Sequence, residues 1–303
     1  MIDTIQFPLK DRVTTFLQKL QNEITSGLES LDGAATFRED VWERPGGGGG
    51  RSRVLTDGKI FEKAGVNYSE VYGTSPEYLT KNQPSAGEFY ATGVSLVLHP
   101  HSPKIPTIHA NFRYFELSNG KAWFGGGIDL TPNYLDEEDA INFHNTLKKT
   151  CDHHDRNYFP KFKQWADDYF LIKHRGERRG VGGIFFDHLG ADSNDLEPQF
   201  SFLQDIANTF LPAYTPIVEK HRTEIYSEDE RRWQLLRRGR YVEFNLVYDK
   251  GTVFGLETGG RIESILMSLP TLARWEYDHH PFPDSPEEAL VKVLITPRDW
   301  AIV

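Results

Sequence analysis

The amino-acid sequence predicts an α+β fold in which a large, mainly antiparallel β-sheet is flanked by α-helices. Three observations lead to this class: strand patterns are grouped between residues 36 and 130, helical patterns occupy the middle of the chain, and a hairpin pattern comes late. The chain carries no repeat at solenoid spacing and no linker rich in proline or serine. We therefore expect one domain over residues 1–303, with residues 1–35 as its N-terminal helical segment.

The first half of the chain predicts one helix followed by strands. Apolar residues recur at helical spacing over residues 9–31, at Val13, Phe16, Leu17, Leu20, Ile24, Leu28 and Leu31. Short runs rich in β-branched and aromatic residues then predict six strands. They are Thr36–Glu43, Arg51–Leu55, Lys59–Glu62, Gly93–His99, Ile108–Leu117 and Lys121–Leu130.

The second half predicts helices and a late hairpin. Helical patterns cover residues 137–152, 160–173, 199–211 and 228–238, with Pro212 ending the third. A strand over Arg240–Tyr248 runs into the turn Asp249-Lys250-Gly251, which predicts a hairpin into residues 252–257. A helix beginning near Gly260, a strand over 271–277 and a terminal helix over 286–294 complete the expected order.

The composition argues against several classes of protein. Twenty Phe, 13 Tyr and six Trp supply more apolar surface than a disordered chain carries. No stretch approaches the roughly 18 apolar residues of a membrane-spanning helix. The N-terminal residues show neither an export signal nor an Arg- and Ser-rich transit pattern. The single cysteine, Cys151, cannot form an internal disulfide, which suits a reducing compartment. Together with the absence of a leader pattern, this leads us to expect a soluble cytoplasmic protein.

The charge distribution bears on the class of ligand. The net charge of −10 disfavours nucleic acid, whose phosphate backbone is normally neutralised by a basic protein. Positive charge is nevertheless clustered over residues 173–179 and 231–240. These clusters are consistent with an anionic small molecule. Ion pairing with neighbours such as Glu177, Asp229 and Glu230 is an equally open interpretation.

The segment 108–117 carries the most informative pattern. In a strand, alternate side chains share a face, so His109, Asn111 and Arg113 point to the same side. An imidazole, an amide and a guanidinium together can move protons and grip carboxylates. The neighbouring predicted strand has its own such set, Ser95, Val97 and His99. If the two faces coincide they form one polar floor on the sheet; the alternative is a solvated polar face.

Three glycine-rich segments suggest further positions. The run Gly125–Gly127 precedes Asp129, where a bend would hold the carboxylate near a ligand, or where a bulge would leave it capping a turn. The run Gly46–Gly50 lacks the Gly-Lys-Ser/Thr ending of a phosphate loop and favours a flexible flap. A helical pattern follows Gly259, Gly260 and Arg261. These residues are consistent with a helix N-terminus that binds an anion, or with an ordinary loop before the helix.

Histidines offer a candidate metal site. The set is His99, His109, His144 and His174. No HExxH motif and no compact pair of histidines with a carboxylate is present, so no bound metal is expected, and these four are the ligands if one is bound. His144 also fits a buried structural histidine, and Cys151 fits a small buried apolar side chain.

Several long stretches together resemble the oxygen-dependent coproporphyrinogen III oxidases, from about residue 36 onward. They include IHANFRYFE, WFGGGIDLTP, YFLIKHRGERRGVGGIFFD, RRGRYVEFNLVYDKGTVFGLETGGRIESILMSLP and RWEYDH, together with RPGGGGGRSRVL and FEKAGVNYSEVYG. The resemblance implies oxidative decarboxylation of two propionates of coproporphyrinogen III to vinyls, yielding protoporphyrinogen IX, carbon dioxide and hydrogen peroxide. It implies oxygen as co-substrate, no organic cofactor and a homodimer with contacts over residues 241–276, and it leaves a divalent metal open.

The resemblance also assigns residues. It implies His109 as the proton donor, and Arg113 and Asp129 in handling the substrate. The substrate-binding positions that it implies are Ser95, Asn111, Phe112, Arg113, Gly259, Gly260 and Arg261. As a hypothesis, Asp129 accepts from pyrrole N–H groups, Arg113 holds the reacting propionate, and the glycine-rich flap excludes water.

Three alternatives to this enzyme stay open at the level of sequence. A histidine-ligated metalloenzyme would lose its activity on chelation, whereas a tetrapyrrole-binding protein without catalysis would consume no oxygen. A nucleic-acid binder using the arginines of residues 231–240 would lose affinity steeply with salt, and the net charge already disfavours it.

Overall fold

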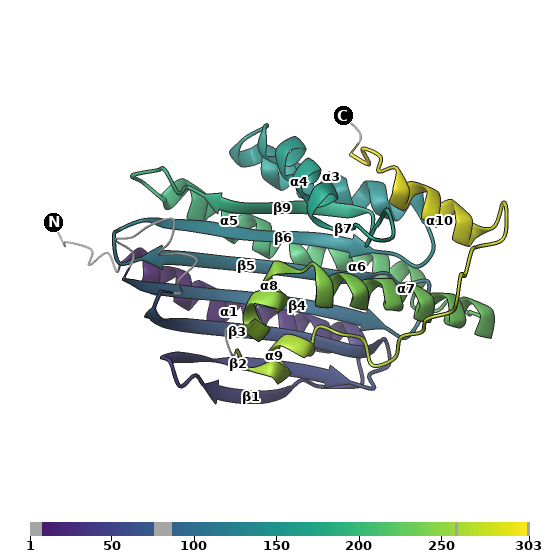
Figure 1. Ribbon diagram of the computed structural model, residues 1–303, viewed down its shortest axis with the longest axis horizontal. Coiled ribbons are helices and arrows are strands. Elements are labelled where there is room, and N and C mark those ends of the chain that lie inside the picture. The colour runs from purple at the N-terminus through teal and green to yellow at the C-terminus, as the bar shows by residue number, and fades with distance from the viewer. Residues whose placement is uncertain (1–7, 76–86, 258–259, 302–303) are drawn as a thin grey trace.

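The computed structural model describes residues 8–75, 87–257 and 260–301. Its centre is a seven-stranded sheet in the order β1-β2-β3-β4-β5-β6-β9, with every neighbouring pair antiparallel (Figure 1). Its strands are β1 (Arg38–Glu43), β2 (Gly48–Thr56), β3 (Phe61–Thr74), β4 (Glu88–Pro100), β5 (Thr107–Leu117), β6 (Ala122–Thr131) and β9 (Gly182–Leu189). A small second sheet pairs β7 (Leu171–Ile172) with β8 (Glu177–Arg178). The predicted α+β class is confirmed.

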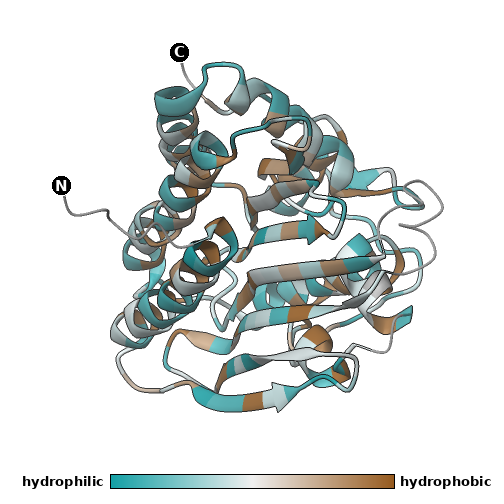
Figure 2. Ribbon diagram, turned by 90° about the vertical axis from the view of Figure 1, so that its left-hand side faces the viewer, coloured by the Kyte–Doolittle hydropathy of each residue, from teal (hydrophilic) through white to brown (hydrophobic). Residues whose placement is uncertain are grey.

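Helices cover both faces of this sheet. They are α1 (Leu9–Asp32), α3 (Glu137–His154), α4 (Tyr158–Tyr169), α5 (Glu197–Asn208), α6 (Phe210–His221), α7 (Glu228–Val247), α8 (Lys250–Glu257), α9 (Ile262–Leu266) and α10 (Pro286–Ile295). Figure 1 shows α7, α8 and α9 in front of the sheet and α1, α5 and α6 behind it. Figure 2, turned by 90°, shows the layers from the side, with hydrophilic and hydrophobic residues mixed along the strands. No helix in the described ranges has a segment long and apolar enough to cross a membrane.

The main core lies between the sheet and the helices behind it. Each strand turns alternate residues toward this layer, because successive side chains point to opposite faces. On β5, Ile108, Ala110 and Phe112 are fully buried and belong to the same apolar cluster as Leu17 and Leu28 of α1. The opposite face of the sheet, toward α7 and α9, is therefore free to carry the polar residues.

Two strands and the hairpin predicted in the second half are wrong. The structure continues α7 through Val247, and α8 follows where the return strand was expected. The sequence over 240–248 is rich in Val, Tyr and Phe, which favours strands, but its buried residues Tyr241, Phe244 and Asn245 are spaced for one helix face. Residues 271–277 form no regular element.

Other boundaries also differ from those predicted. The helix expected to end at Pro212 is two helices: α5 ends at Asn208, and Pro212 falls in the first turn of α6, where a proline sacrifices no intrahelical hydrogen bond. Strands β2, β3 and β4 are longer than predicted, and β9 was not predicted. The Gly46–Gly50 run is not a free flap, because Gly48–Gly50 belong to β2 and the positive φ of Gly47 and Gly48 turns the hairpin from β1.

Candidate active site

The polar faces predicted for two strands coincide in the sheet. In the β4–β5 register, Val97 lies opposite His109 and Ser95 opposite Asn111. Residues that pair directly across an antiparallel ladder share a face, so the predicted polar floor is confirmed as a structural feature. Its half-buried members come from three adjacent strands: Asn67, Ser69, Ser95, His109, Asn111 and Arg113.

His109 and Asp129 form a hydrogen-bonded pair at one side of this floor. They lie opposite each other on β5 and β6, and His109 Nδ1 is 2.7 Å from Asp129 Oδ1. The carboxylate side chain is 2% exposed and the imidazole 18% exposed. A carboxylate oxygen only accepts, so Nδ1 carries the proton and Nε2 is the nitrogen left for exchange with a ligand.

Arg179 holds the other side of the Asp129 carboxylate. Its Nη2 donates to both carboxylate oxygens at 2.9 Å, and its Nη1 donates to Asn245 at 2.8 Å. The Arg179 side chain is 2% exposed, and its guanidinium lies against the rings of Phe170, Tyr241 and Phe244. Burial raises the pKa of Asp129, but the positive charge of Arg179 and the His109 hydrogen bond outweigh it, leaving the pKa below its ordinary value. Asp129 is therefore an anion at neutral pH.

Arg113 lies on the same face, farther along β5. Its Nη1 donates to Asn111 Oδ1 at 2.8 Å, and its Nη2 is 3.1 Å from Asp187 Oδ1. The side chain is 32% exposed, so the guanidinium is accessible to a ligand. A guanidinium in this position can bind a carboxylate through two parallel hydrogen bonds.

The glycine run before Asp129 provides room for close packing, and it lies within β6 rather than at a bend. A Cβ on Gly125 would come within 2.6 Å of Arg113 Nε, so this glycine lets the arginine lie flat on the sheet. On the opposite face, a Cβ on Gly126 would meet the ring of Phe186 at 2.9 Å. The register between β6 and β9 shifts beside these residues, which confirms the bulge of the alternative interpretation. The other part of that interpretation is wrong, because Asp129 lies within β6 and bonds to His109 and Arg179 and does not cap a turn.

The remaining predicted site residues are divided among different environments. Phe112 is fully buried in the core on the opposite face, so its side chain cannot contact a ligand on the floor. Arg261 pairs with Asp40 and donates to Ser264 at 3.1 Å. The N–H of Gly260 donates to Gly255 at 2.7 Å, so it does not form the anion-binding helix start that the sequence suggested. Gly259 lies outside the described residues.

The four candidate metal-ligating histidines do not form one group. His99 is buried, with Nε2 2.9 Å from the Ser268 carbonyl, and burial holds its pKa well below the ordinary value. His144 donates to Ala140 from α3, on the core side of the sheet, where burial lowers its pKa to about 3. His174 is exposed and paired with Glu243. The predicted set is therefore wrong as a single ligand cluster within the described residues. Among the residues that the structure describes, the only group of three or more potential ligand atoms close enough to share a metal ion comes from Asp136, Asp139 and His221.

The two basic clusters are largely used inside the fold. Ion pairs join Arg231 and Arg238 to Glu62, Arg237 to Glu177, Arg232 to Glu276, Arg175 to Glu243 and Arg179 to Asp129. Internal pairing, one of the two interpretations left open, therefore accounts for most of them. Cys151 is buried as expected, and burial raises the pKa of its thiol to about 12.

Sequence reasoning missed the residues that hold this site together. Arg179 was counted only as part of a basic cluster, and Asn245 was placed on a strand. Nothing in the spacing of residues 179 and 129 indicates their contact, because it depends on how β8 and β9 return to the sheet. The one usable signal was an arginine flanked by aromatic segments, which is compatible with a guanidinium buried among rings.

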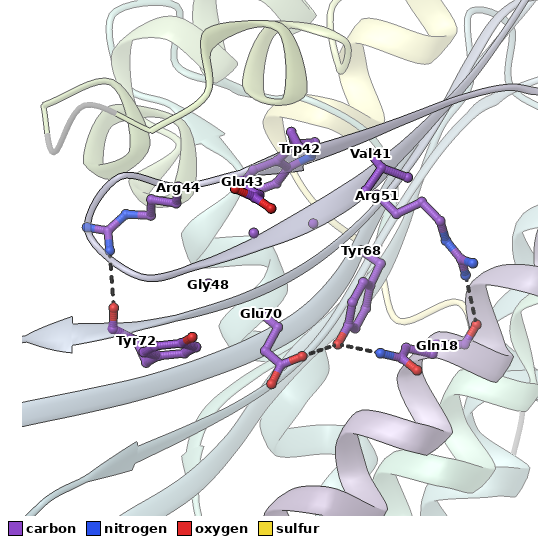
Figure 3. A pocket seen from close by; sticks show the side chains of 12 residues that line it. Gln18, Val41, Trp42, Glu43, Arg44, Gly48, Arg51, Tyr68, Glu70 and Tyr72 are labelled. Atoms are coloured by element: carbon purple, nitrogen blue, oxygen red, sulfur yellow. Dashed lines mark hydrogen bonds between the residues drawn. The ribbon is translucent and has the colours of Figure 1, made fainter.

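Two pockets lie near the β1–β3 side of the sheet. One, of about 670 Å³, lies against α1 and includes Arg44, Arg51 and Glu70 in its lining (Figure 3). Figure 3 shows Tyr68 between Glu70 and Gln18, with a hydrogen bond to each of them. The other, of about 300 Å³, lies between α9 and strands β1–β3, on the side of the sheet that carries the polar floor.

The fold and the site define a class of protein: an α+β protein with features of an enzyme. One face of its sheet carries an imidazole held by a buried carboxylate, together with a guanidinium that a ligand can reach. The sequence matches the coproporphyrinogen III oxidase family over residues 12–300. The chain belongs to this family.

Individual relatives agree with that assignment. An oxygen-dependent coproporphyrinogen-III oxidase of Drosophila melanogaster is 52% identical, over 96% of this chain and 78% of that protein. A chloroplastic oxygen-dependent coproporphyrinogen-III oxidase of Glycine max is 52% identical, over 96% of this chain and 80% of its own length. The mitochondrial oxygen-dependent enzyme of Homo sapiens is also 52% identical, over 96% of this chain and 67% of its own length.

The names of these relatives correct one expectation. The sequence analysis expected a cytoplasmic protein, but the Glycine max and Homo sapiens proteins are chloroplastic and mitochondrial. The expectation rested on the composition of the N-terminal residues and on the single cysteine, and neither of these features distinguishes the cytoplasm from the interior of an organelle.

Proposed function

We propose that the polar floor on β3, β4 and β5 is the surface on which this chain converts coproporphyrinogen III. The reaction is that of the family, an oxygen-dependent oxidative decarboxylation of two propionates to vinyls that yields protoporphyrinogen IX in haem biosynthesis. The observation that carries the proposal is that Arg113 and the His109–Asp129 pair occupy one half-exposed surface. A non-catalytic tetrapyrrole carrier would not need a carboxylate-oriented imidazole beside its carboxylate-binding group.

The chemistry sets what the protein must supply. Each propionate loses its carboxylate as carbon dioxide and gives up one hydrogen with two electrons from the methylene next to the pyrrole. Oxygen takes this hydride equivalent and one further proton, and leaves as hydrogen peroxide. Because the pyrrole is electron-rich, we propose that it reacts with oxygen without an organic cofactor. The chain then has to hold the carboxylate, move a proton and limit access of water.

Arg113 is proposed to hold the reacting propionate. Its guanidinium is half-exposed and lies over Gly125. Asp187, 28% exposed, shares the guanidinium with Asn111 and can be displaced by a substrate carboxylate. When the carboxylate leaves as carbon dioxide, Arg113 can return to Asp187.

His109 is proposed to move the proton, and Asp129 to position it. The earlier hypothesis, in which Asp129 accepts from pyrrole N–H groups, fits the geometry less well. Both carboxylate oxygens already accept hydrogen bonds, and the side chain is 2% exposed. A carboxylate bound to Nδ1 selects the tautomer that leaves Nε2 toward the ligand, so Asp129 acts through His109.

We further propose a homodimer with contacts over residues 241–276. Exposed apolar side chains are concentrated there, which marks an association surface. They are Leu246, Val247, Leu256, Ile262, Leu272 and Trp275, each between 39% and 58% exposed. Val247→Glu should convert the dimer to a monomer in light scattering after size exclusion; a wild-type monomer at micromolar concentration would contradict the assignment.

The decisive experiment measures oxygen uptake and product fluorescence with coproporphyrinogen III, aerobically and anaerobically. The wild-type chain should turn over only with oxygen. His109→Gln should lower kcat by about 100-fold or more, because positioned proton transfer contributes about that much. Arg44→Gln removes a positive charge from the pocket against α1 and should leave turnover unchanged. Wild-type binding of the tetrapyrrole without oxygen consumption would instead indicate a carrier.

A further inference from the structure

The pocket between α9 and strands β1–β3 is a charged site to which the steps proposed above assign no residue, although Arg261 in its lining is one of the substrate-binding positions that the resemblance implies. Its volume is about 300 Å³. The ionisable residues in its lining are Arg38, Asp40, Lys63, Arg261 and Glu263. Three cations face two carboxylates, so the pocket carries one uncompensated positive charge.

The three cations are not equally satisfied. Arg261 is paired with Asp40. Lys63 is half-buried, and its Nζ donates to the Leu269 carbonyl at 2.8 Å. Burial lowers the pKa of Lys63, and the negative charge of Glu263 offsets this effect only in part.

Arg38 is exposed on β1. Its guanidinium has no hydrogen bond or ion pair to any of the described residues. An anion entering this pocket would therefore meet two cations that lack a full counter-charge.

The position of the pocket relates it to the polar floor. The register places Arg38 opposite Val54, and the same cross-strand row continues through Gly65 and Val97 to His109. Four strand intervals of about 4.8 Å put Arg38 roughly 19 Å from His109 across the sheet. Arg113 pairs into the row of Trp42, four residues along β1 from Arg38, so Arg38 and Arg113 lie roughly 23 Å apart at Cα. The two arginine side chains and the extended propionate arms of one tetrapyrrole can together span that separation.

We propose that this pocket is a second carboxylate-binding subsite, in which Lys63 and Arg38 hold a propionate that coproporphyrinogen III retains. The inference rests on the proposed function. The substrate has four propionates, of which two are removed and two persist in the product. A group that binds a retained carboxylate fixes which edge of the macrocycle reaches Arg113, so the subsite determines orientation.

Two non-reacting fluorescent porphyrins separate the two subsites. Coproporphyrin III carries all four propionates, whereas protoporphyrin IX carries only the two retained ones. Lys63→Gln and Arg38→Gln should each weaken binding of both porphyrins by about 10-fold, since losing a charge-assisted hydrogen bond has about this effect. Arg113→Met should weaken coproporphyrin III and leave protoporphyrin IX unchanged. Arg44→Gln is the matched control, because it removes the same charge from the other face of the β1–β2 hairpin.

The outcomes are distinct. The subsite is refuted if both Lys63→Gln and Arg38→Gln bind each porphyrin within about twofold of wild type. It is equally refuted if they weaken coproporphyrin III alone, because the pocket would then take a reacting propionate. Arg38 is exposed and without a partner among the described residues, so its variant tests the subsite even if Lys63→Gln unfolds. If wild-type protein binds both porphyrins through Lys63 yet consumes no oxygen, the subsite stands and the oxidase proposal fails.

Discussion

Replacing Arg179 by methionine tests how the negative charge of Asp129 is maintained. Both side chains are 2% exposed, and Nη2 lies 2.9 Å from each carboxylate oxygen. Methionine retains an apolar side chain among Phe170, Tyr241 and Phe244 but leaves the carboxylate buried without its cation. Removing one partner of a buried ion pair destabilises a protein by ~3–5 kcal/mol. The loss is a large part of a typical ~5–15 kcal/mol free energy of unfolding.

The loss should depend on pH in a defined direction. In the wild type, burial raises the pKa of Asp129, yet Arg179 and His109 leave it below the ordinary value. Such a carboxyl stabilises the fold above its unfolded pKa of about 3.9, and the contribution disappears as the pH falls through the folded value. Without Arg179, burial dominates and raises the pKa of Asp129. The folded state of the variant therefore recovers stability as the pH falls and the buried carboxylate becomes protonated. The difference between the two proteins is therefore largest near pH 7 and shrinks toward pH 4.

Urea titrations at pH 7 and pH 5 measure both effects. Arg222→Met is the matched control, because its pair with Glu219 is exposed and should contribute at most ~1 kcal/mol at either pH. A loss below ~1 kcal/mol for Arg179→Met at pH 7, or the same loss at both pH values, would show that Arg179 does not stabilise the Asp129 anion.

Three further expectations follow from the same contacts. Asp129→Asn should lower kcat by about 100-fold with little change in KM, measured by steady-state oxygen uptake; a rise in KM alone would indicate direct substrate binding. Gly125→Val should raise KM about 10-fold by displacing the Arg113 guanidinium, with unfolding by urea nearly unchanged; an unaltered KM would contradict this role. Burial lowers the pKa of His144 to about 3, so wild-type stability falls as pH drops below about 6.5. His144→Leu should flatten that limb by up to ~1.4 kcal/mol per pH unit in urea titrations, and an identical pH profile would contradict it.

The floor of the site could be predicted because it depends on local alternation. His109, Asn111 and Arg113 share a face in any strand, whatever its neighbours. Whether Ser95 joins them depends on the β4–β5 register, which the core-facing residues and the connection set together. The sequence therefore predicted which residues of each strand share a face. That the polar faces of β4 and β5 lie on the same side of the sheet depended on a register that the sequence did not determine.

The supporting residues could not be predicted, because their positions depend on tertiary packing. Tyr241 and Asn245 lie in a segment whose intrinsic preference favours a strand, and burial against the sheet selects a helix instead. Arg179 reaches Asp129 across 50 residues of chain. Its burial among aromatic rings is a property of the assembled fold, and local spacing carries no trace of it.

Because side chains alternate between the two faces of β5, substitutions at odd-numbered positions affect the polar floor and substitutions at even-numbered positions affect the core. Residues 109, 111 and 113 face the floor, whereas Ile108, Ala110 and Phe112 are fully buried in the core. Deleting a single residue from this strand would exchange the two faces, placing the imidazole and the guanidinium in the apolar core and the isoleucine on the polar floor. We therefore expect this strand to tolerate a change of residue type better than a change of length, and length changes to be tolerated better in the connections at its ends.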